Sequence, residues 1–200
     1  MSDVSDPSDA ASEWRGHTVL QVPVPALEEF VRSRTAHYDA GFVSSDPMFV
    51  HAHVTALGPF AADPTPSDLE NVARIAGETR VFDAVLTEVV AFPDGIIHLR
   101  PEPDGGFRDL TRRLADAFPE HPPYAGRHGP PEAVVPHLTL DLISPAVSVE
   151  STRQSLGRTV PVTIRAERLD LVWYESGACR LLASWSFSQP FSQPFSQAFS

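Results

Sequence analysis

The stretches VHAHVTAL (residues 50–57) and VPHLTLDL (residues 135–142) decide how the rest of the chain can be arranged. Each has the length and the β-branched and aliphatic composition of a strand, in which side chains two residues apart point to the same face. Each also carries a histidine and, two residues later, a threonine. An imidazole and a hydroxyl therefore lie roughly 7 Å apart on one face of each strand, and aliphatic side chains form the other face. The four polar residues are His53, Thr55, His137 and Thr139.

The repetition of this pattern predicts the fold class. His53 and His137 are 84 residues apart, which suggests two similar half-domains that face one another. Strand alternation places His51 on the same face as His53, and Asp141 on the same face as His137. We therefore predict an α+β domain of two pseudo-symmetric lobes, each an antiparallel sheet with helices on its outer face, around a central cleft.

The segments around the two motifs show the periodicities of strands and helices. The tripeptide PDG at 93–95 separates two apolar runs and predicts a β-hairpin. Ser67 and Glu70 have the spacing of a capping box at the start of a helix. Because Pro136 cannot donate to a ladder, the second motif strand should begin at His137 or lie at a sheet edge. Further predicted strands cover residues 17–24, 81–92, 96–100, 160–174 and 179–187, and further predicted helices cover 25–37, 106–118 and 148–157.

Composition divides the chain into three parts. Residues 1–15 are acidic, polar and without periodicity, which predicts a disordered leader. Residues 16–187 carry both motifs and the apolar periodicity, and we predict that they form a single bilobal domain. Residues 188–200 continue a Phe-Ser-Gln-Pro repeat that begins at Phe187. A repeat of period four with proline suits no regular element, so we predict a low-complexity tail.

Charge and cysteine content limit the partners and the compartment. The net charge is −11, and all 15 cationic residues are arginines. This balance argues against a protein that grips long nucleic acid, which requires a basic surface, and leaves a small nucleotide or an RNA end as the ligand. The apolar runs are shorter than the ~18 residues needed to cross a bilayer, and the N-terminus lacks the pattern of a signal peptide. Cys179 has no partner for an internal disulfide, so we expect a reducing, cytoplasmic compartment. We also expect a monomer that makes no membrane contact.

With both motifs in place, the chain resembles the 2H phosphoesterases. This superfamily comprises bacterial 2′-5′ RNA ligases and RNA 2′,3′-cyclic phosphodiesterases and is named for two H-x-T/S motifs. The resemblance covers roughly residues 16–185 and includes HTVLQVPVP at 17–25, GPF at 58–60 and PPYAG at 122–126. It implies that the two motif histidines are catalytic and that the two motif threonines bind the substrate phosphate.

The residue types in the motifs suit phosphoester chemistry that needs neither a metal nor a cofactor. Opening a 2′,3′-cyclic phosphate requires a base to take a proton from water and an acid to protonate the departing ribose oxygen, and histidine can do either near pH 7. The threonine hydroxyls can donate to the non-bridging oxygens, where charge is concentrated in the transition state. The sequence therefore predicts a 2′,3′-cyclic phosphodiesterase or a 2′-5′ RNA ligase-like enzyme, with the acid and base roles unassigned. Further candidates for a contact with the base or the groove are Tyr124, Arg127 and His128.

Two other functions use the same residues. The chain could be a binding module that holds nucleotide phosphates without turning them over. It could also be a zinc hydrolase, with His51, His53 and His137 as three ligands of one ion. The zinc hypothesis is the weaker, because no carboxylate or additional histidine repeats with the motif, and Asp141 is the only candidate nearby.

Overall fold

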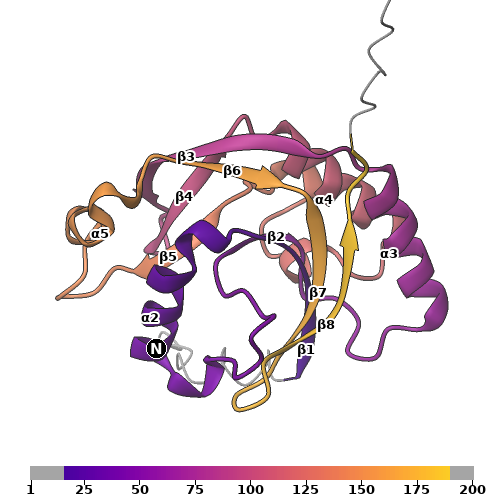
Figure 1. The fold of residues 1–200 in the computed structure, drawn as a ribbon, viewed down its shortest axis with the longest axis horizontal. Helices are drawn as coiled ribbons and strands as arrows, with labels where there is room; N and C mark the ends of the chain where they lie inside the picture. The colour runs from indigo at the N-terminus through magenta and orange to yellow at the C-terminus, as the bar shows by residue number, and fades with distance from the viewer. Residues whose placement is uncertain (1–15, 190–200) are drawn as a thin grey trace, which may run out of the picture.

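Two four-stranded sheets organise residues 16–189, the part of the chain that the computed structural model describes (Figure 1). The strand order is β2-β1-β7-β8 in the first sheet and β5-β4-β3-β6 in the second, and all neighbours are antiparallel. The first sheet contains β1 (His17–Pro23), β2 (His53–Leu57), β7 (Arg168–Tyr174) and β8 (Arg180–Ser186). The second contains β3 (Phe82–Ala91), β4 (Ile96–Glu102), β5 (Leu138–Leu142) and β6 (Val162–Ala166). The predicted class, an α+β fold of two antiparallel lobes, is confirmed.

The two halves of the chain repeat one connection, which is the source of the pseudo-symmetry. A strand is followed by a helix and then by the motif strand, which returns antiparallel beside the first strand. The first half runs β1-α2-β2 and the second runs β4-α4-β5. The α-helices of the described residues are α2 (Glu28–Tyr38), α3 (Pro66–Glu78), α4 (Gly105–Ala117) and α5 (Val149–Leu156). Short 3-10 turns are η1 (Pro25–Leu27), η2 (Ala40–Phe42), η3 (Pro123–Gly126), η4 (Pro131–Ala133) and η5 (Gly157–Thr159).

Both motif strands lie at the edge of their sheets, and these two edges meet. Cα atoms of β2 and β5 come within 8 Å of each other. The helices are exchanged between the halves, because α2 contacts β5 and α4 contacts β2. The exchange locks the lobes together and places the two His-x-Thr motifs on facing strands. The edge position of β5 also agrees with the proline that precedes it.

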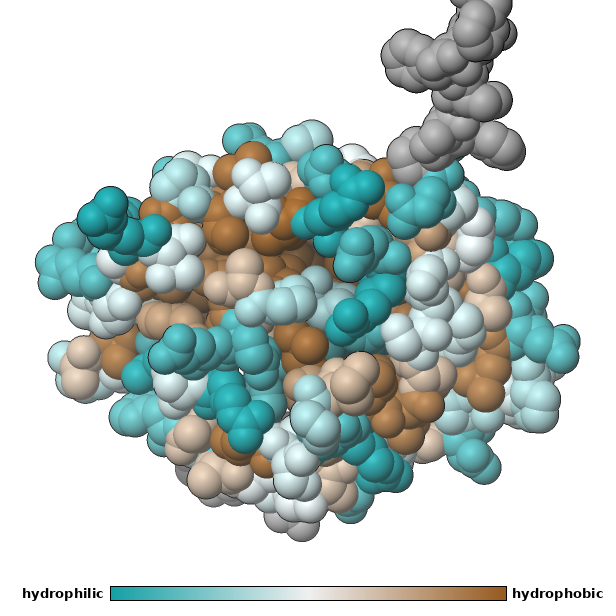
Figure 2. All heavy atoms as spheres, in the orientation of Figure 1, coloured by the Kyte–Doolittle hydropathy of each residue, from teal (hydrophilic) through white to brown (hydrophobic). Residues whose placement is uncertain are grey.

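Leucine side chains from both sheets fill one continuous core. Leu20 and Leu57 from the first sheet and Leu99 and Leu138 from the second are fully buried in the same cluster. Burying a leucine contributes roughly 1.5–3 kcal/mol, so this shared core holds the lobes as one unit. On the face seen in Figure 2, polar side chains surround an apolar hollow between α2 and the layer formed by β3 and β6.

The capping box at the start of α3 differs from the sequence prediction. Thr65 and Asp68 form it, in place of Ser67 and Glu70. The Thr65 hydroxyl accepts from the Asp68 N–H at 3.2 Å, and the Asp68 carboxylate accepts from the Thr65 N–H at 2.9 Å. Pro66 explains the shift, because its fixed φ and missing N–H suit the first position of a helix.

The segment 160–174, predicted as one strand, is two strands in different sheets. β6 ends beside β3 in the second sheet, and β7 starts two residues later beside β1 in the first. The chain changes sheet at Glu167, whose carbonyl accepts the Phe187 N–H at 2.8 Å. No glycine or proline marks this point, so the sequence offers no turn signal there.

The ends of the described region bear on the predicted boundaries. Ser188, assigned from sequence to the tail, bonds to the body of the protein, because its N–H donates to the Thr79 carbonyl at 2.8 Å. The predicted leader, residues 1–15, and the tail from residue 190 lie outside the described residues. Within 16–189, no helix has the length and apolar character needed to span a bilayer.

Candidate active site

The two motif histidines are held by the same backbone contact. His53 Nδ1 donates to the carbonyl of His51 at 2.7 Å, and His137 Nδ1 donates to the carbonyl of Val135 at 2.8 Å. In each case the acceptor lies two residues earlier in the chain. The bond fixes the neutral tautomer with its proton on Nδ1, so Nε2 carries the lone pair that can exchange a proton.

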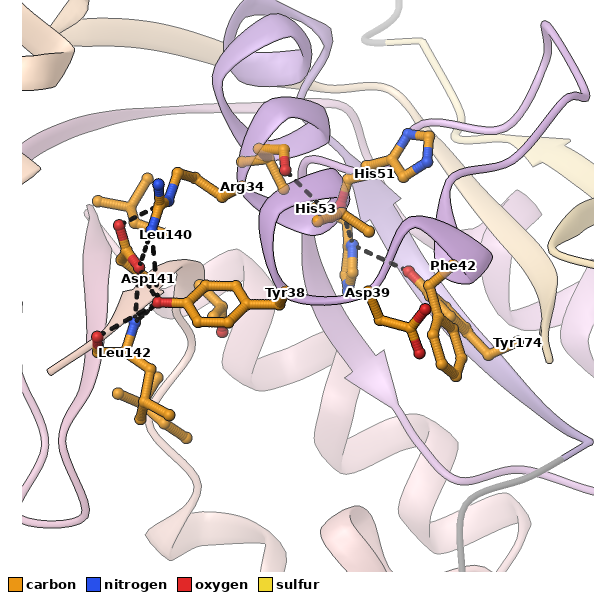
Figure 3. Close-up of a pocket in the computed structure, with 14 residues that line it drawn as sticks. Arg34, Tyr38, Asp39, Phe42, His51, His53, Leu140, Asp141, Leu142 and Tyr174 are labelled. Atoms are coloured by element: carbon orange, nitrogen blue, oxygen red, sulfur yellow. Dashed lines mark hydrogen bonds and ion pairs between the residues drawn. The ribbon is translucent and has the colours of Figure 1, made fainter. Parts of the chain in front are cut away.

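Three cavities open around these histidines. Cavity 1, of about 450 Å³, is lined by His53 from the first motif and by Thr139 from the second (Figure 3). Cavity 2, of about 460 Å³, contains His137. Cavity 3, of about 280 Å³, contains His53 and Thr55. Because cavity 1 combines residues of both motifs, the two halves of the chain contribute to one site.

His51 does not share the face of His53, contrary to the prediction from alternation. β2 begins at His53, so His51 lies before the strand and is buried. Its Nδ1 donates to the Glu28 carboxylate at 2.6 Å, and its Nε2 accepts from the Ser44 N–H at 3.1 Å. Figure 3 shows the two rings pointing in different directions. Both nitrogens of His51 are therefore occupied, which leaves no lone pair for a zinc ion.

Asp141, the carboxylate nearest to the motifs in the zinc hypothesis, is also committed elsewhere. Its side chain is buried and pairs with Arg34 and Tyr38 of α2 (Figure 3). Among residues 16–189, no three side chains of the types His, Cys, Asp and Glu converge as metal ligands.

The loop before the second motif carries the predicted groove contacts. Tyr124 and His128 line cavity 2 together with His137. The ring of Tyr124 stacks on that of His137, with centroids 6.0 Å apart and planes inclined by 18°. Arg127 lies in the same loop, and its N–H donates to the Tyr124 carbonyl at 3.1 Å. A contact between any of these side chains and a nucleobase stays a prediction.

Comparison with known proteins identifies the family of this arrangement. The sequence model of the 2′-5′ RNA ligase superfamily matches residues 23–178. The chain belongs to that superfamily. No curated protein sequence matches it.

Solved structures of this fold have low sequence identity to the chain. E. coli LigT complexed with 3′-AMP is 16% identical with a TM-score of 0.53, covering 87% of this chain and 99% of LigT. E. coli LigT complexed with NADP⁺ is 16% identical with a TM-score of 0.51, covering 88% and 99%. The protein TT0787 of Thermus thermophilus is 20% identical with a TM-score of 0.51, covering 86% and 97%. At these identities the likeness shows the fold, two lobes of antiparallel sheet around a cleft.

Sequence reasoning on this superfamily member missed the aromatic residues that support each histidine. Tyr174 of β7 lies beside His53, with its hydroxyl 3.5 Å from Nδ1. Phe92 packs edge-on against His137 at 5.0 Å and stacks on the fully buried His98 at 3.7 Å. His98 thus lies behind the second motif, 5.4 Å from His137 between ring centroids. No local sequence pattern marks His98, because its position depends on the pairing of β4 with the motif strand β5.

Burial makes both motif histidines weaker bases than a free imidazole. Desolvation, with a smaller effect of the charge of His137, lowers the pKa of His53 to about 4 despite the opposing hydrogen bond to the His51 carbonyl. Desolvation also lowers the pKa of His137, again opposed by the bond to its backbone acceptor, Val135.

These shifts predict an acid-shifted pH profile for kcat/KM. One imidazole must be neutral and the other protonated, so kcat/KM should rise as pH passes the lower pKa and fall as it passes the higher. With one pKa near 4 and the other below 6.5, the maximum should lie between those values. A bound phosphate favours the imidazolium, so the limbs of kcat should lie at higher pH than those of kcat/KM. Steady-state rates from pH 4 to 9 check this; a kcat/KM maximum above pH 7 would contradict it.

Proposed function

We propose that the protein is a metal-independent phosphoesterase that acts on a 2′,3′-cyclic phosphate, or on a 2′-5′ phosphodiester, of a small nucleotide or an RNA end. One observation carries the proposal. Two histidines from opposite lobes are each fixed through Nδ1 to the backbone, which leaves two Nε2 atoms for proton transfer, and the motif strands of the two lobes contact each other. Membership of the 2′-5′ RNA ligase superfamily supports phosphoester chemistry of this kind.

The reaction assigns one role to each imidazole. In hydrolysis, the neutral Nε2 of one histidine accepts a proton from water, whose oxygen forms the new bond to phosphorus. The protonated Nε2 of the other gives its proton to the ribose oxygen as the old P–O bond breaks. Thr55 and Thr139 donate hydrogen bonds to the non-bridging oxygens, which carry the developing charge. Ligation follows the same path with the 5′-hydroxyl of a second nucleotide in place of water, and cleavage of the 2′-5′ bond is its reverse. Each histidine therefore serves as acid in one direction and as base in the other.

The size of the cavities supports a nucleotide as substrate. Cavities 1 and 2 lie within the range of ~300–1,000 Å³ typical of small-molecule sites. LigT, a structural relative of this chain, is known in complexes with 3′-AMP and NADP⁺, so the fold accommodates nucleotides in that protein. A net charge of −11 disfavours an extended grip on RNA, so the substrate is a short one or the end of a chain.

Incubation with the four nucleoside 2′,3′-cyclic monophosphates and a 2′-5′-linked dinucleotide tests the proposal. Products are separated by chromatography, with and without EDTA. We expect ring opening to a single monophosphate isomer, or cleavage of the 2′-5′ bond, at rates that EDTA does not change. Tight binding without turnover between pH 4 and 9 would instead identify a nucleotide-binding module. Activity lost with EDTA and restored by zinc would revive the metal hypothesis.

A further inference from the structure

Tyr124 connects the two motifs physically. Its ring stacks on His137 of the second motif, at 6.0 Å between centroids. Its backbone N–H donates to the carbonyl of Gly58 at 2.6 Å, just beyond the first motif strand. Its side chain lines cavity 3 together with Thr55 of the first motif. The phenol thus extends from one motif to the other.

The backbone at this point is strained. Tyr124 has φ 52° and ψ 33°, and Ala125 has φ 53° and ψ 32°, both in the left-handed region. Two successive L-residues in this conformation cost roughly 1–2 kcal/mol each, and glycine would relieve the cost. The buried Pro123 and a bond from the Ala125 N–H to the Pro122 carbonyl at 2.9 Å hold the turn. Backbone strain of this kind is concentrated at active and ligand-binding sites, where it holds a side chain in one position.

The Tyr124 side chain lies beside the region between the two motifs, where a substrate phosphate would bind. If one phosphate contacts both motifs, it must lie between Thr55 and His137. Tyr124 lines cavity 3 together with Thr55 and lines cavity 2 together with His137. A phosphate in that position would therefore lie beside the Tyr124 side chain, which borders both cavities.

We propose that the Tyr124 hydroxyl is a third hydrogen-bond donor to the substrate phosphate and acts with Thr55 as one hydroxyl pair. This rests on the proposed function. Each of the two hydroxyls has one proton. When Tyr124 donates to Thr55, the Thr55 proton is directed at a phosphate oxygen. When Thr55 does not accept from Tyr124, the Tyr124 hydroxyl can donate to the phosphate itself. Desolvation raises the pKa of Tyr124, in opposition to the smaller effect of Thr55, so the phenol keeps its proton at working pH. Thr139, on the other lobe, lines cavity 1 and belongs to a separate contact.

A double-mutant cycle with a built-in control tests this assignment. Tyr124→Phe removes one oxygen and keeps the ring, and we expect kcat/KM to fall about 10- to 100-fold, at or below the usual cost of one transition-state donor because Thr55 remains. Combined with Thr55→Ala, the loss should be much smaller than the product of the two single losses. When Tyr124→Phe is combined with Thr139→Ala, the loss in kcat/KM should be close to the product of the two single losses. Tyr38→Phe removes the same atom from a hydroxyl that bonds to Asp141 and should not couple to Thr55.

The outcomes separate this inference from the proposed function. An unchanged kcat/KM in Tyr124→Phe, or equal coupling to Thr55 and Thr139, would overturn the role of Tyr124 even if the wild type is active. If the wild type turns over no substrate, the proposed function fails, and the same cycle is measured as the Kd of 3′-AMP by calorimetry. A several-fold weaker Kd that couples to Thr55 alone would then support the hydroxyl pair. An unchanged Kd, or no binding by the wild type, would overturn it.

Discussion

Replacing His53 or His137 by alanine is expected to reduce turnover of a 2′,3′-cyclic nucleotide by about 10²–10⁴-fold. This is the usual cost of losing a positioned general acid or base. Neither neighbour can substitute, because His51 has both ring nitrogens occupied and His98 is fully buried. His37→Ala, an exposed histidine on α2, is the matched control and should leave kcat unchanged.

The double replacement should be less damaging than the product of the two single losses. Acid and base act on the same transition state, so once one is missing the other contributes little. The Kd for 3′-AMP should change by only a few-fold, since both threonines remain. Single-turnover rates and calorimetry on all four proteins measure both quantities. If the losses multiply, or if one alanine variant keeps wild-type kcat, the two histidines do not divide the chemistry.

The sequence was sufficient to predict the parts of the fold and site that depend on short-range patterns. The His-x-Thr spacing and the aliphatic alternate positions predicted both motif strands, because a strand repeats every two residues. The PDG tripeptide predicted the hairpin between β3 and β4, where Gly95 has a φ of 91° that favours glycine. The repeat of the motif predicted two lobes, and the topology repeats in the same way.

The parts that could not be predicted depend on contacts between distant residues. His51 leaves the face of His53 because Glu28, 23 residues earlier, accepts from its ring. Hydrogen bonds from His51 and from the Ala52 N–H lower the pKa of that carboxylate despite its burial, so the contact is stable near neutral pH. Tyr174 reaches His53 from 121 residues away through the order of the first sheet. No local pattern contains such pairings.

The contact between Arg34 and Asp141 is another long-range pairing, and it supplies the second large expected effect. Arg34 Nε and Nη2 approach the two oxygens of Asp141 at 2.8 and 2.9 Å. The same carboxylate accepts from the Tyr38 hydroxyl and from the Leu142 N–H. α2 belongs to the first half of the chain and β5 to the second, so this cluster ties the lobes together at the rim of cavity 1.

Arg34→Leu is expected to lower the free energy of unfolding by about 3 kcal/mol. The side chain of Asp141 is only 4% exposed, so removing its partner leaves a buried carboxylate without its countercharge, which typically costs ~3–5 kcal/mol. Tyr38 and the Leu142 N–H remain as donors, which places the expected loss at the lower end. Urea unfolding followed by circular dichroism measures it. Arg74→Leu breaks an exposed helical pair with Glu78, 54% and 53% exposed, and should cost less than about 0.5 kcal/mol.

The double variant Arg34→Leu/Asp141→Leu distinguishes a buried charge from lost packing. With both charges removed, no unpaired carboxylate remains, and apolar replacement of a buried ion pair is often close to neutral. We therefore expect the double variant to recover most of the stability lost in Arg34→Leu. Arg34→Lys should recover less, because an ammonium cannot reproduce the two-pronged contact of the guanidinium. If the double variant is as unstable as the sum of the single variants, the two side chains stabilise the lobes independently and the ion pair is not the link between them.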